Sequence, residues 1–151
     1  MKKKALLKTI SRERDRLLVA LDGLTEEEMA RPGACGEWSA KDVLAHIAAW
    51  EEECTRAIGA LGKGEPWDVD YDLDAWNDYT YRQRRSLPLG QVRRQFEDAH
   101  QTLLEAICGL TEEQLARNND IREWIANSTY AHCQEHLPDL MSWKEKQSSR
   151  A

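Results

Sequence analysis

Residues 24–31 read Leu-Thr-Glu-Glu-Glu-Met-Ala-Arg, and residues 110–117 repeat them as Leu-Thr-Glu-Glu-Gln-Leu-Ala-Arg. The repeat reaches beyond these positions, because a gap-free alignment of residues 17–46 with residues 103–132 has 15 identities in 30 positions. Agreement of this kind at one fixed offset indicates an internal duplication. Two copies of a helical hairpin that pack about a pseudo-twofold axis bring their equivalent positions together at that axis. We therefore expect residues far apart in the sequence to meet there.

The last identity of this alignment pairs His46 with His132, and residues 131–136 read Ala-His-Cys-Gln-Glu-His. His132 and His136 stand one helical turn apart, so both imidazoles lie on one face, at a spacing suited to a shared metal ion. The first copy has Trp50 in place of His136, so the copies differ where a site would need asymmetry. The duplication thus predicts that His46 faces the other two histidines in one site.

Apolar side chains recur at helical spacing in four long segments, which predicts an all-α fold of the four-helix-bundle class. Thr25 with Glu28, and Ser39 with Asp42, have the spacing of capping boxes that start helices. Pro138 lies inside the last segment, where its missing N–H predicts a kink. The four segments are residues 5–22, 39–58, 88–107 and 127–147.

The composition changes over residues 62–71, where glycine, proline and acidic residues replace the apolar stripe. We interpret this stretch as the crossover between the two copies. Residues 72–87 include Trp76 and Asn77 and predict a helix whose aromatic content suits a lid over one end of the bundle. The alternative is that the aromatic side chains only fill the gap that a crossover leaves. We expect one domain over residues 1–151, with the first repeat at about 5–60, the crossover at 61–87 and the second repeat at about 88–147.

The 151 residues carry a net charge of −6 and the pI is near 5.3. Nucleic acids and anionic membranes attract basic surfaces, so we expect neither as a partner. Charged residues make up 32% of the chain, and no apolar run has the length of a membrane span or a signal peptide. The four cysteines form no CxxC pair, which favours the reducing cytoplasm as the compartment.

Three neutral imidazoles from two packed helices can hold a first-row divalent ion such as Zn²⁺, Ni²⁺ or Fe²⁺ on one side. Structural zinc sites take four ligands, so three leave positions open for chemistry. Water at such a position is acidified to a pKa of about 7, and a thiol binds there as thiolate. The alternative is that the imidazoles hydrogen-bond to one another and to carboxylates within the core. The fourth histidine, His100, borders an apolar stripe and is expected to be structural.

Two carboxylates share a helical face with the predicted ligands. Glu53 lies two turns after His46, and Asp139 lies close to His136 on the last helix. Each is placed to hydrogen-bond a ligand or to act as a fourth one. The alternative for both is an ordinary exposed or salt-bridged carboxylate.

Residues 38–47, Trp-Ser-Ala-Lys-Asp-Val-Leu-Ala-His-Ile, together with residues 130–136, Tyr-Ala-His-Cys-Gln-Glu-His, resemble the DinB-like superfamily of four-helix bundles. Asp-Ala-Trp-Asn at 74–77, Pro-Leu at 88–89 and Phe-Glu at 96–97 resemble its ClbS/DfsB branch. The similarity spans nearly the whole chain. It implies an up-up-down-down bundle with a long crossover between the second and third helices, often as a homodimer. It also implies a metal site at one end, formed by His46, His132 and His136.

The resemblance implies a class of activity as well. Members of the superfamily include isomerases and transferases that use low-molecular-weight thiols, and the ClbS-like branch includes a self-protection protein that hydrolyses a reactive cyclopropane in a genotoxin. Our leading hypothesis is a metal-dependent enzyme that acts on a small electrophilic molecule by thiol transfer or hydrolysis, with Trp50, Trp76 and Asn77 shaping its pocket. The alternatives are a non-catalytic protein that sequesters a small molecule, and a dimeric helical scaffold with a vestigial metal site.

Overall fold

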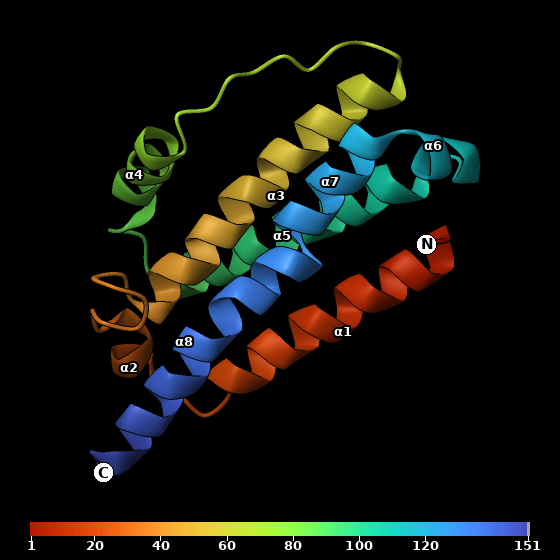
Figure 1. The fold of residues 1–151 in the computed structure, drawn as a ribbon. Coiled ribbons are helices and arrows are strands. Elements are labelled where there is room, and N and C mark those ends of the chain that lie inside the picture. The colour runs from red at the N-terminus through yellow and green to blue at the C-terminus, as the bar shows by residue number, and fades with distance from the viewer. Residues whose placement is uncertain (151) are drawn as a thin grey trace.

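The computed structural model describes residues 1–150, and its elements are helices (Figure 1). No strand occurs within this described range, so the all-α bundle is confirmed. The four long helices are α1 (Lys3–Leu21), α3 (Ala40–Gly62), α5 (Leu89–Cys108) and α8 (Tyr130–Ser149). The shorter ones are α2 (Glu26–Ala30), α4 (Leu73–Arg84), α6 (Glu112–Arg117) and α7 (Asn119–Ser128).

The internal duplication is visible in the helix boundaries. α1 and α5 begin at Lys3 and Leu89, and α2 and α6 begin at Glu26 and Glu112. Both pairs are therefore separated by the offset found in the sequence. The most extensive helix contacts are those of α3 with α5 and of α1 with α8. In the repeat, α1 corresponds to α5 and α3 corresponds to α8. A twofold rotation that exchanges the two copies therefore converts the α3–α5 pair into the α8–α1 pair.

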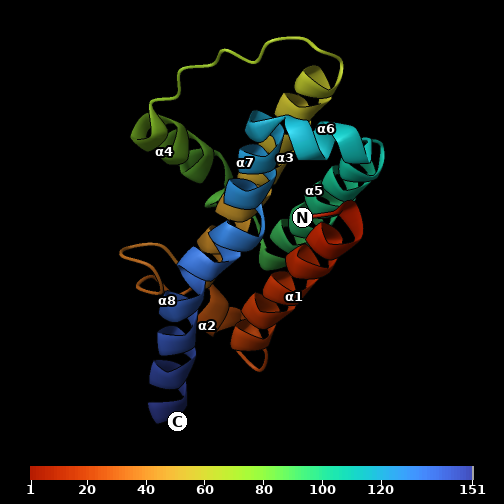
Figure 2. The same cartoon turned by 45° about the vertical axis from the view of Figure 1, so that its right-hand side comes forward.

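Hydrogen bonds at the helix ends show how the long helices run. Gln114, just after α5, donates to the carbonyl of Gly62 at the end of α3 (2.7 Å), so these two helices are parallel. Lys144, late in α8, donates to the carbonyl of Val19 late in α1 (3.0 Å), so this pair is parallel too. Along the chain the directions read up, down, down, up (Figure 2), in place of the up-up-down-down order that the resemblance implied. The long crossover is the connection that joins parallel helices.

The predicted helix starts are confirmed. Thr25 accepts from the backbone N–H of Glu28 while the Glu28 side chain accepts from Thr25, and Ser39 forms the same capping box with Asp42. These boxes satisfy N–H groups that a helix start leaves without partners. The box at Ser39 fixes the first turn of α3 and hence the direction in which His46 points.

The two copies of the repeat differ in the segment that precedes His46 in the first copy and His132 in the second. The last long helix begins at Tyr130, because Thr129 (φ −118°, ψ −100°) separates it from α7, which the sequence pattern did not predict. The first copy has a loop in place of α7. Its Gly33 and Gly36 adopt φ values of 112° and 58°, which other residues rarely reach, whereas the second copy has non-glycine residues there. Helix α8 is continuous through Pro138.

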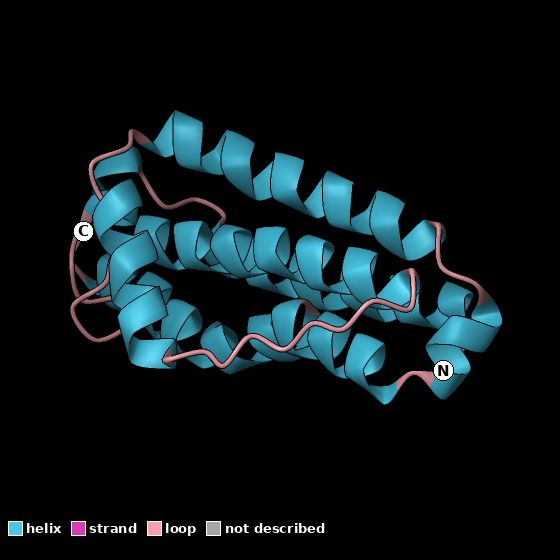
Figure 3. Ribbon diagram, turned by 90° about the horizontal axis from the view of Figure 1, so that it is seen from above, coloured by secondary structure: helices cyan, strands magenta, loops and turns pink. Residues whose placement is uncertain are grey.

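The crossover runs along the bundle as an extended connection and ends in α4 (Figures 1 and 3). α4 packs on α3, and its role as a lid stays a prediction. Two side-chain contacts hold it there: Trp50 donates to Asn77 (2.9 Å), and Arg84 forms a paired hydrogen bond with Glu52 (2.9 and 3.1 Å). No helix within residues 1–150 is both long enough and apolar enough to cross a membrane.

Candidate metal centre and adjoining cavity

The three predicted histidines come together between α3 and α8. One ring nitrogen of each lies within 4.8 Å of those of the other two, and all three residues are buried. The Nε2 atoms of His46 and His132 are 3.0 Å apart. Ring centroids are separated by 4.8 Å for His46 and His132, 5.2 Å for His46 and His136, and 4.8 Å for His132 and His136. The duplication therefore produced the convergence that the sequence predicted.

Burial keeps these imidazoles neutral. Desolvation, with a smaller effect from the neighbouring imidazole of His136, lowers the pKa of His46 to about 3. Desolvation and the two other histidines lower the pKa of His132 to about 2. Desolvation also lowers the pKa of His136, although the nearby charges of Glu135 and Asp139 oppose the shift. At pH 7 each ring therefore has a free lone pair, which is the form that binds a metal ion.

Three ring nitrogens of the triad have no hydrogen-bond partner among the described residues. They are His46 Nδ1, His132 Nδ1 and His136 Nε2. The Ser128 carbonyl lies close enough to His132 to favour its protonated form, yet the geometry does not make a hydrogen bond to the buried nitrogen. A buried polar atom without a partner destabilises a fold by about 1–3 kcal/mol. This pattern disfavours the alternative in which the imidazoles satisfy one another within the core.

The donor set fits a first-row divalent ion. Nitrogen ligands at about 2.0–2.1 Å in a tetrahedral site are about 3.3 Å apart, close to the 3.0 Å between His46 and His132. The most distant pair of nitrogens, within 4.8 Å, must approach by about 1.5 Å when an ion binds. Three imidazoles also leave coordination positions free, as in catalytic rather than structural sites.

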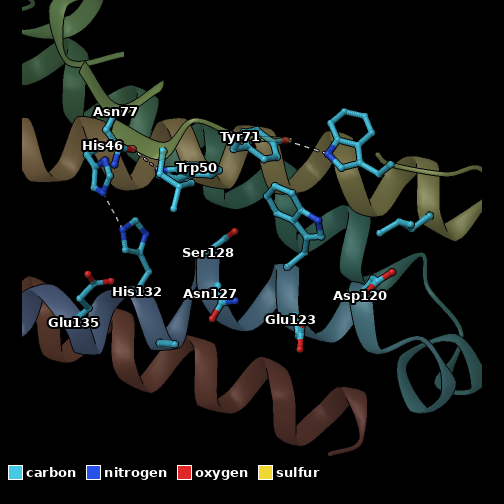
Figure 4. Close-up of a pocket in the computed structure, with 15 residues that line it drawn as sticks. His46, Trp50, Tyr71, Asn77, Asp120, Glu123, Asn127, Ser128, His132 and Glu135 are labelled. Carbon is cyan, nitrogen blue, oxygen red and sulfur yellow. Dashed lines mark hydrogen bonds between the residues drawn. The ribbon is translucent and has the colours of Figure 1, made fainter. Parts of the chain in front are cut away.

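A cavity of about 640 Å³ adjoins the histidines (Figure 4). Two of the expected pocket residues line it, Trp50 and Asn77, together with His46 and His132. Trp76 is not part of the lining; its ring packs on Trp50 with centroids 3.9 Å apart and so supports the wall from behind. The remaining lining comes from Leu61 at the end of α3, the crossover, Leu73 at the start of α4, α7 and the first turns of α8.

The two carboxylates singled out from the sequence lie in different surroundings. Glu53 accepts from Arg56 (2.9 Å) and lies near Tyr71, whose pKa its charge helps to raise. Asp139 is exposed, and its charge favours protonation of His136. Within the described chain no hydrogen bond joins either carboxylate to an imidazole. Their role as ligand supports stays a prediction.

Three aromatic residues near the histidines were missed by the sequence analysis. Tyr71 and Trp124 line the cavity, and the Trp38 ring packs on His46 at a centroid distance of 4.9 Å. The repeat held a signal for one of them, because Trp124 is the equivalent of Trp38 in the second copy. Tyr71 lies in the crossover, which has no counterpart in the repeat and no periodicity.

The fourth histidine of the chain, His100, is buried in a different environment. His100 Nδ1 is 2.9 Å from a carboxylate oxygen of Glu51, which is 1% exposed. Arg14 lies beside the same carboxylate at 3.8 Å and donates to the carbonyl of Phe96 (3.1 Å). These side chains join α1, α3 and α5 in the interior. They support the structural role expected for His100.

The fold and the buried triad define an all-helical bundle protein with a histidine cluster between two of its long helices. The profile of the DinB superfamily matches residues 9–138, and the chain belongs to this superfamily. Among solved structures, "Sibling Lethal Factor Precursor - DfsB" has a TM-score of 0.83 at 19% identity and covers 97% of both chains. The colibactin self-resistance protein ClbS, in complex with a dsDNA, has a TM-score of 0.82 at 15% identity over 95% of this chain and 96% of that one.

An uncharacterised protein from Escherichia coli UTI89 is similar to the same degree, with a TM-score of 0.82, 17% identity, and coverage of 97% of this chain and 95% of that one. The search of curated proteins gives no match. The fold is therefore that of the ClbS/DfsB branch, as the resemblance implied.

The complex of ClbS with duplex DNA corrects one expectation. The acidic composition led us to exclude nucleic acid as a partner, and that exclusion was wrong. Net charge averages over the whole surface, whereas DNA binding needs only a local group of basic side chains. A chain with a charge of −6 can carry such a group on one face.

Proposed function

We propose that the protein is a metal-dependent enzyme that acts on a small electrophilic molecule in detoxification or self-protection. The observation that carries this proposal is the triad itself: three neutral imidazoles, each with an unpartnered buried nitrogen, of which His46 and His132 line a cavity large enough for a small organic molecule. The self-resistance role of ClbS, which shares this fold, supports the protective function.

His46, His132 and His136 would hold the ion. When bound, a divalent ion at this site supplies the Lewis acidity that converts water or a low-molecular-weight thiol into a strong nucleophile near neutral pH. The aromatic side chains of the cavity bind the apolar part of the substrate and exclude bulk water. Trp50 is held in one orientation by its hydrogen bond to Asn77, so the wall nearest to His46 is preorganised.

Metal analysis of protein purified without a histidine tag tests the site. We expect close to one equivalent of a first-row divalent metal per chain, and we expect His132→Ala to lose it. His100→Ala is the matched control, because it also removes a buried imidazole but leaves the triad intact. Wild-type protein that stays metal-free after exposure to Zn²⁺, Ni²⁺ and Fe²⁺ would overturn the proposal.

Product analysis with a model electrophile separates the chemical alternatives. Styrene oxide, incubated with metal-loaded protein with and without glutathione, gives the diol by hydrolysis and a thioether by thiol transfer. Either product should depend on His132. Binding of the epoxide without turnover would favour sequestration instead.

A second candidate function is binding of duplex DNA, which the arginines around the α4–α5 turn favour. Arg85, Arg93 and Arg94 are exposed, and within residues 1–150 none of them lies within salt-bridge distance of a carboxylate. The lysine and arginine side chains that bind phosphates must be free in this way. Fluorescence anisotropy with a labelled duplex should show binding that weakens with salt and is lost on replacing these three arginines by Gln. Replacing Lys8, Arg12 and Arg117 by Gln removes the same charge elsewhere and should have little effect.

A further inference from the structure

The cavity beside the histidines has an aromatic wall. Trp50, Tyr71 and Trp124 contact one another, with ring centroids 5.5, 6.2 and 5.7 Å apart for the pairs 50–71, 50–124 and 71–124. Trp67 extends this wall and donates from its indole N–H to the Tyr71 hydroxyl (3.0 Å). The faces of such rings carry a negative electrostatic potential, so they attract organic cations as well as apolar groups.

The crossover side of the cavity is strongly acidic. Trp67, Tyr71 and Leu73 belong to a segment, residues 64–78, that contains six acidic residues and no lysine or arginine. All six are exposed, and one of them, Asp78, is paired with Arg82. The summed charge of these six, −6, equals the net charge of the whole chain, although none of the six lines the cavity itself. The six are Glu65, Asp68, Asp70, Asp72, Asp74 and Asp78.

The opposite side is acidic too. Asp120 and Glu123 of α7 and Glu135 of α8 line the cavity, and all three are exposed at its rim (Figure 4). None of the 15 described lining residues is a lysine or an arginine. Carboxylates on both sides of an aromatic wall raise the local concentration of cations and repel anions.

The basic residues Arg56 and Arg122 on the flanking helices are paired with groups of the protein. Arg56 is paired with Glu53 (2.9 Å). Arg122 donates to the carbonyls of Leu115 (3.0 Å) and Ala116 (2.7 Å), on the far side of α7 from the aromatic wall. In the metal-free protein, a carboxylate or phosphate on a ligand would therefore find no lysine or arginine partner in the cavity.

We infer that the molecule bound beside the triad is an organic cation: an ammonium, amidinium or guanidinium group lies between the acidic rims while its apolar body packs on the tryptophans. Any reaction of this molecule rests on the proposed function. Its binding to the cavity does not. The arginines of the α4–α5 turn are not part of the lining, so a DNA surface and this cavity are separate.

Binding of three probes of similar size tests the charge preference. Benzyltrimethylammonium, benzyl alcohol and phenylacetate share an aromatic body and differ in charge. We expect calorimetry and tryptophan fluorescence to show about tenfold tighter binding of the cation than of either other probe at low salt. The preference should shrink at 0.5 M salt, since exposed charges are screened at about 3–5 Å there.

Two variants assign the binding to the cavity. Trp124→Leu should weaken the cation about tenfold and benzyl alcohol less, because it removes a ring face as well as apolar area. Asp120→Asn with Glu123→Gln should weaken the cation about threefold and leave benzyl alcohol unchanged. Asp98→Asn with Glu26→Gln is the matched control, because it removes the same charge from exposed sites on α5 and α2.

Equal affinity for the three probes, tighter binding of phenylacetate, or unchanged cation binding in Trp124→Leu would overturn the inference. The measurements use metal-free protein and are repeated with His132→Ala. A failure of the proposed enzyme, seen as absence of metal, therefore leaves these titrations interpretable. A protein that binds its metal but shows no preference for the cation refutes this inference alone.

Discussion

The bundle buries histidines in two settings, and they differ in their partners rather than in their depth. His100 is 9% exposed and shares a hydrogen bond with the Glu51 carboxylate, next to the guanidinium of Arg14. His132 and His136 are 6% and 8% exposed, yet each has a ring nitrogen that no described group satisfies. Burial alone does not separate the two settings; in this chain they differ in whether a carboxylate meets the imidazole.

In the cluster of Arg14, Glu51 and His100, most polar groups find partners within the protein. Arg14 lies over the Phe96 ring at 3.8 Å and donates to the Phe96 carbonyl, so its apolar and polar parts are both used. Its remaining Nη1 and the second oxygen of Glu51 lack hydrogen bonds but lie 3.8 Å apart, within Coulombic attraction. This cluster joins three helices without any external group. The triad has no comparable partners within the described chain, and in our proposal a bound ion would supply them.

The largest expected effect of the triad is on folding stability at acidic pH. In metal-free protein the pKa of His46 is lowered to about 3 from an ordinary value of 6.5, because the folded state disfavours its charge. Between these pH values the unfolded chain takes up a proton that the folded chain does not, so stability falls as the pH falls. The slope is up to about 1.4 kcal/mol per pH unit for each such histidine. Denaturant titrations from pH 7 to pH 4 measure it.

The double variant His46→Gln, His132→Gln is the comparison for this experiment. It removes both strongly shifted groups, so its stability should decline less steeply over the same pH range. Parallel pH profiles for the variant and the wild type would show that the triad does not carry the effect.

The next largest effect concerns folding stability at pH 7. Glu51→Ala removes the buried carboxylate that lies beside both Arg14 and His100 and leaves Arg14 only the exposed carboxylate of Glu97, and we expect the free energy of unfolding to fall by about 3 kcal/mol. His132→Ala in metal-free protein should cost no more than about 1 kcal/mol, because the unpartnered imidazole removed was itself unfavourable. Urea denaturation of both metal-free variants gives the comparison. A loss in His132→Ala as large as that in Glu51→Ala would make the triad a structural cluster.

For metal affinity, in contrast to stability, variants of the triad should have larger effects than variants of the cluster around Glu51. His136→Ala removes one of three ligands, so competition with a chelator should give a loss of affinity of about a hundredfold or more. His100→Ala is expected to retain wild-type affinity, since Glu51 and not the triad is its partner. If His100→Ala weakened the metal as much as His136→Ala, the two clusters would have to be treated as one.

The convergence of His46 with His132 could be predicted because a duplication carries spatial information: equivalent positions meet at a shared axis. The capping boxes could be read because they are local. Glu51 could not be recognised, since an acidic residue in a helix normally faces solvent and its partners come from two other helices. Likewise α7 was missed, because its counterpart in the first copy is a glycine-containing loop and the break at Thr129 has no local signal.

The smallest effect tests whether the two sides of α3 are independent. Trp50 and Glu51 are neighbours in the sequence, yet one lines the cavity and the other belongs to the Arg14 cluster. Asn77→Ala removes the hydrogen bond that joins Trp50 to α4, so we expect a loss of about 1 kcal/mol and a red shift of tryptophan emission. Gln83→Ala, which removes an exposed hydrogen bond to Tyr79 on the same helix, should change neither. Hydrogen exchange should then quicken in α4 but not around His100. Faster exchange around His100 as well would mean that α3 transmits the change, and that the cavity and the structural cluster respond as one unit.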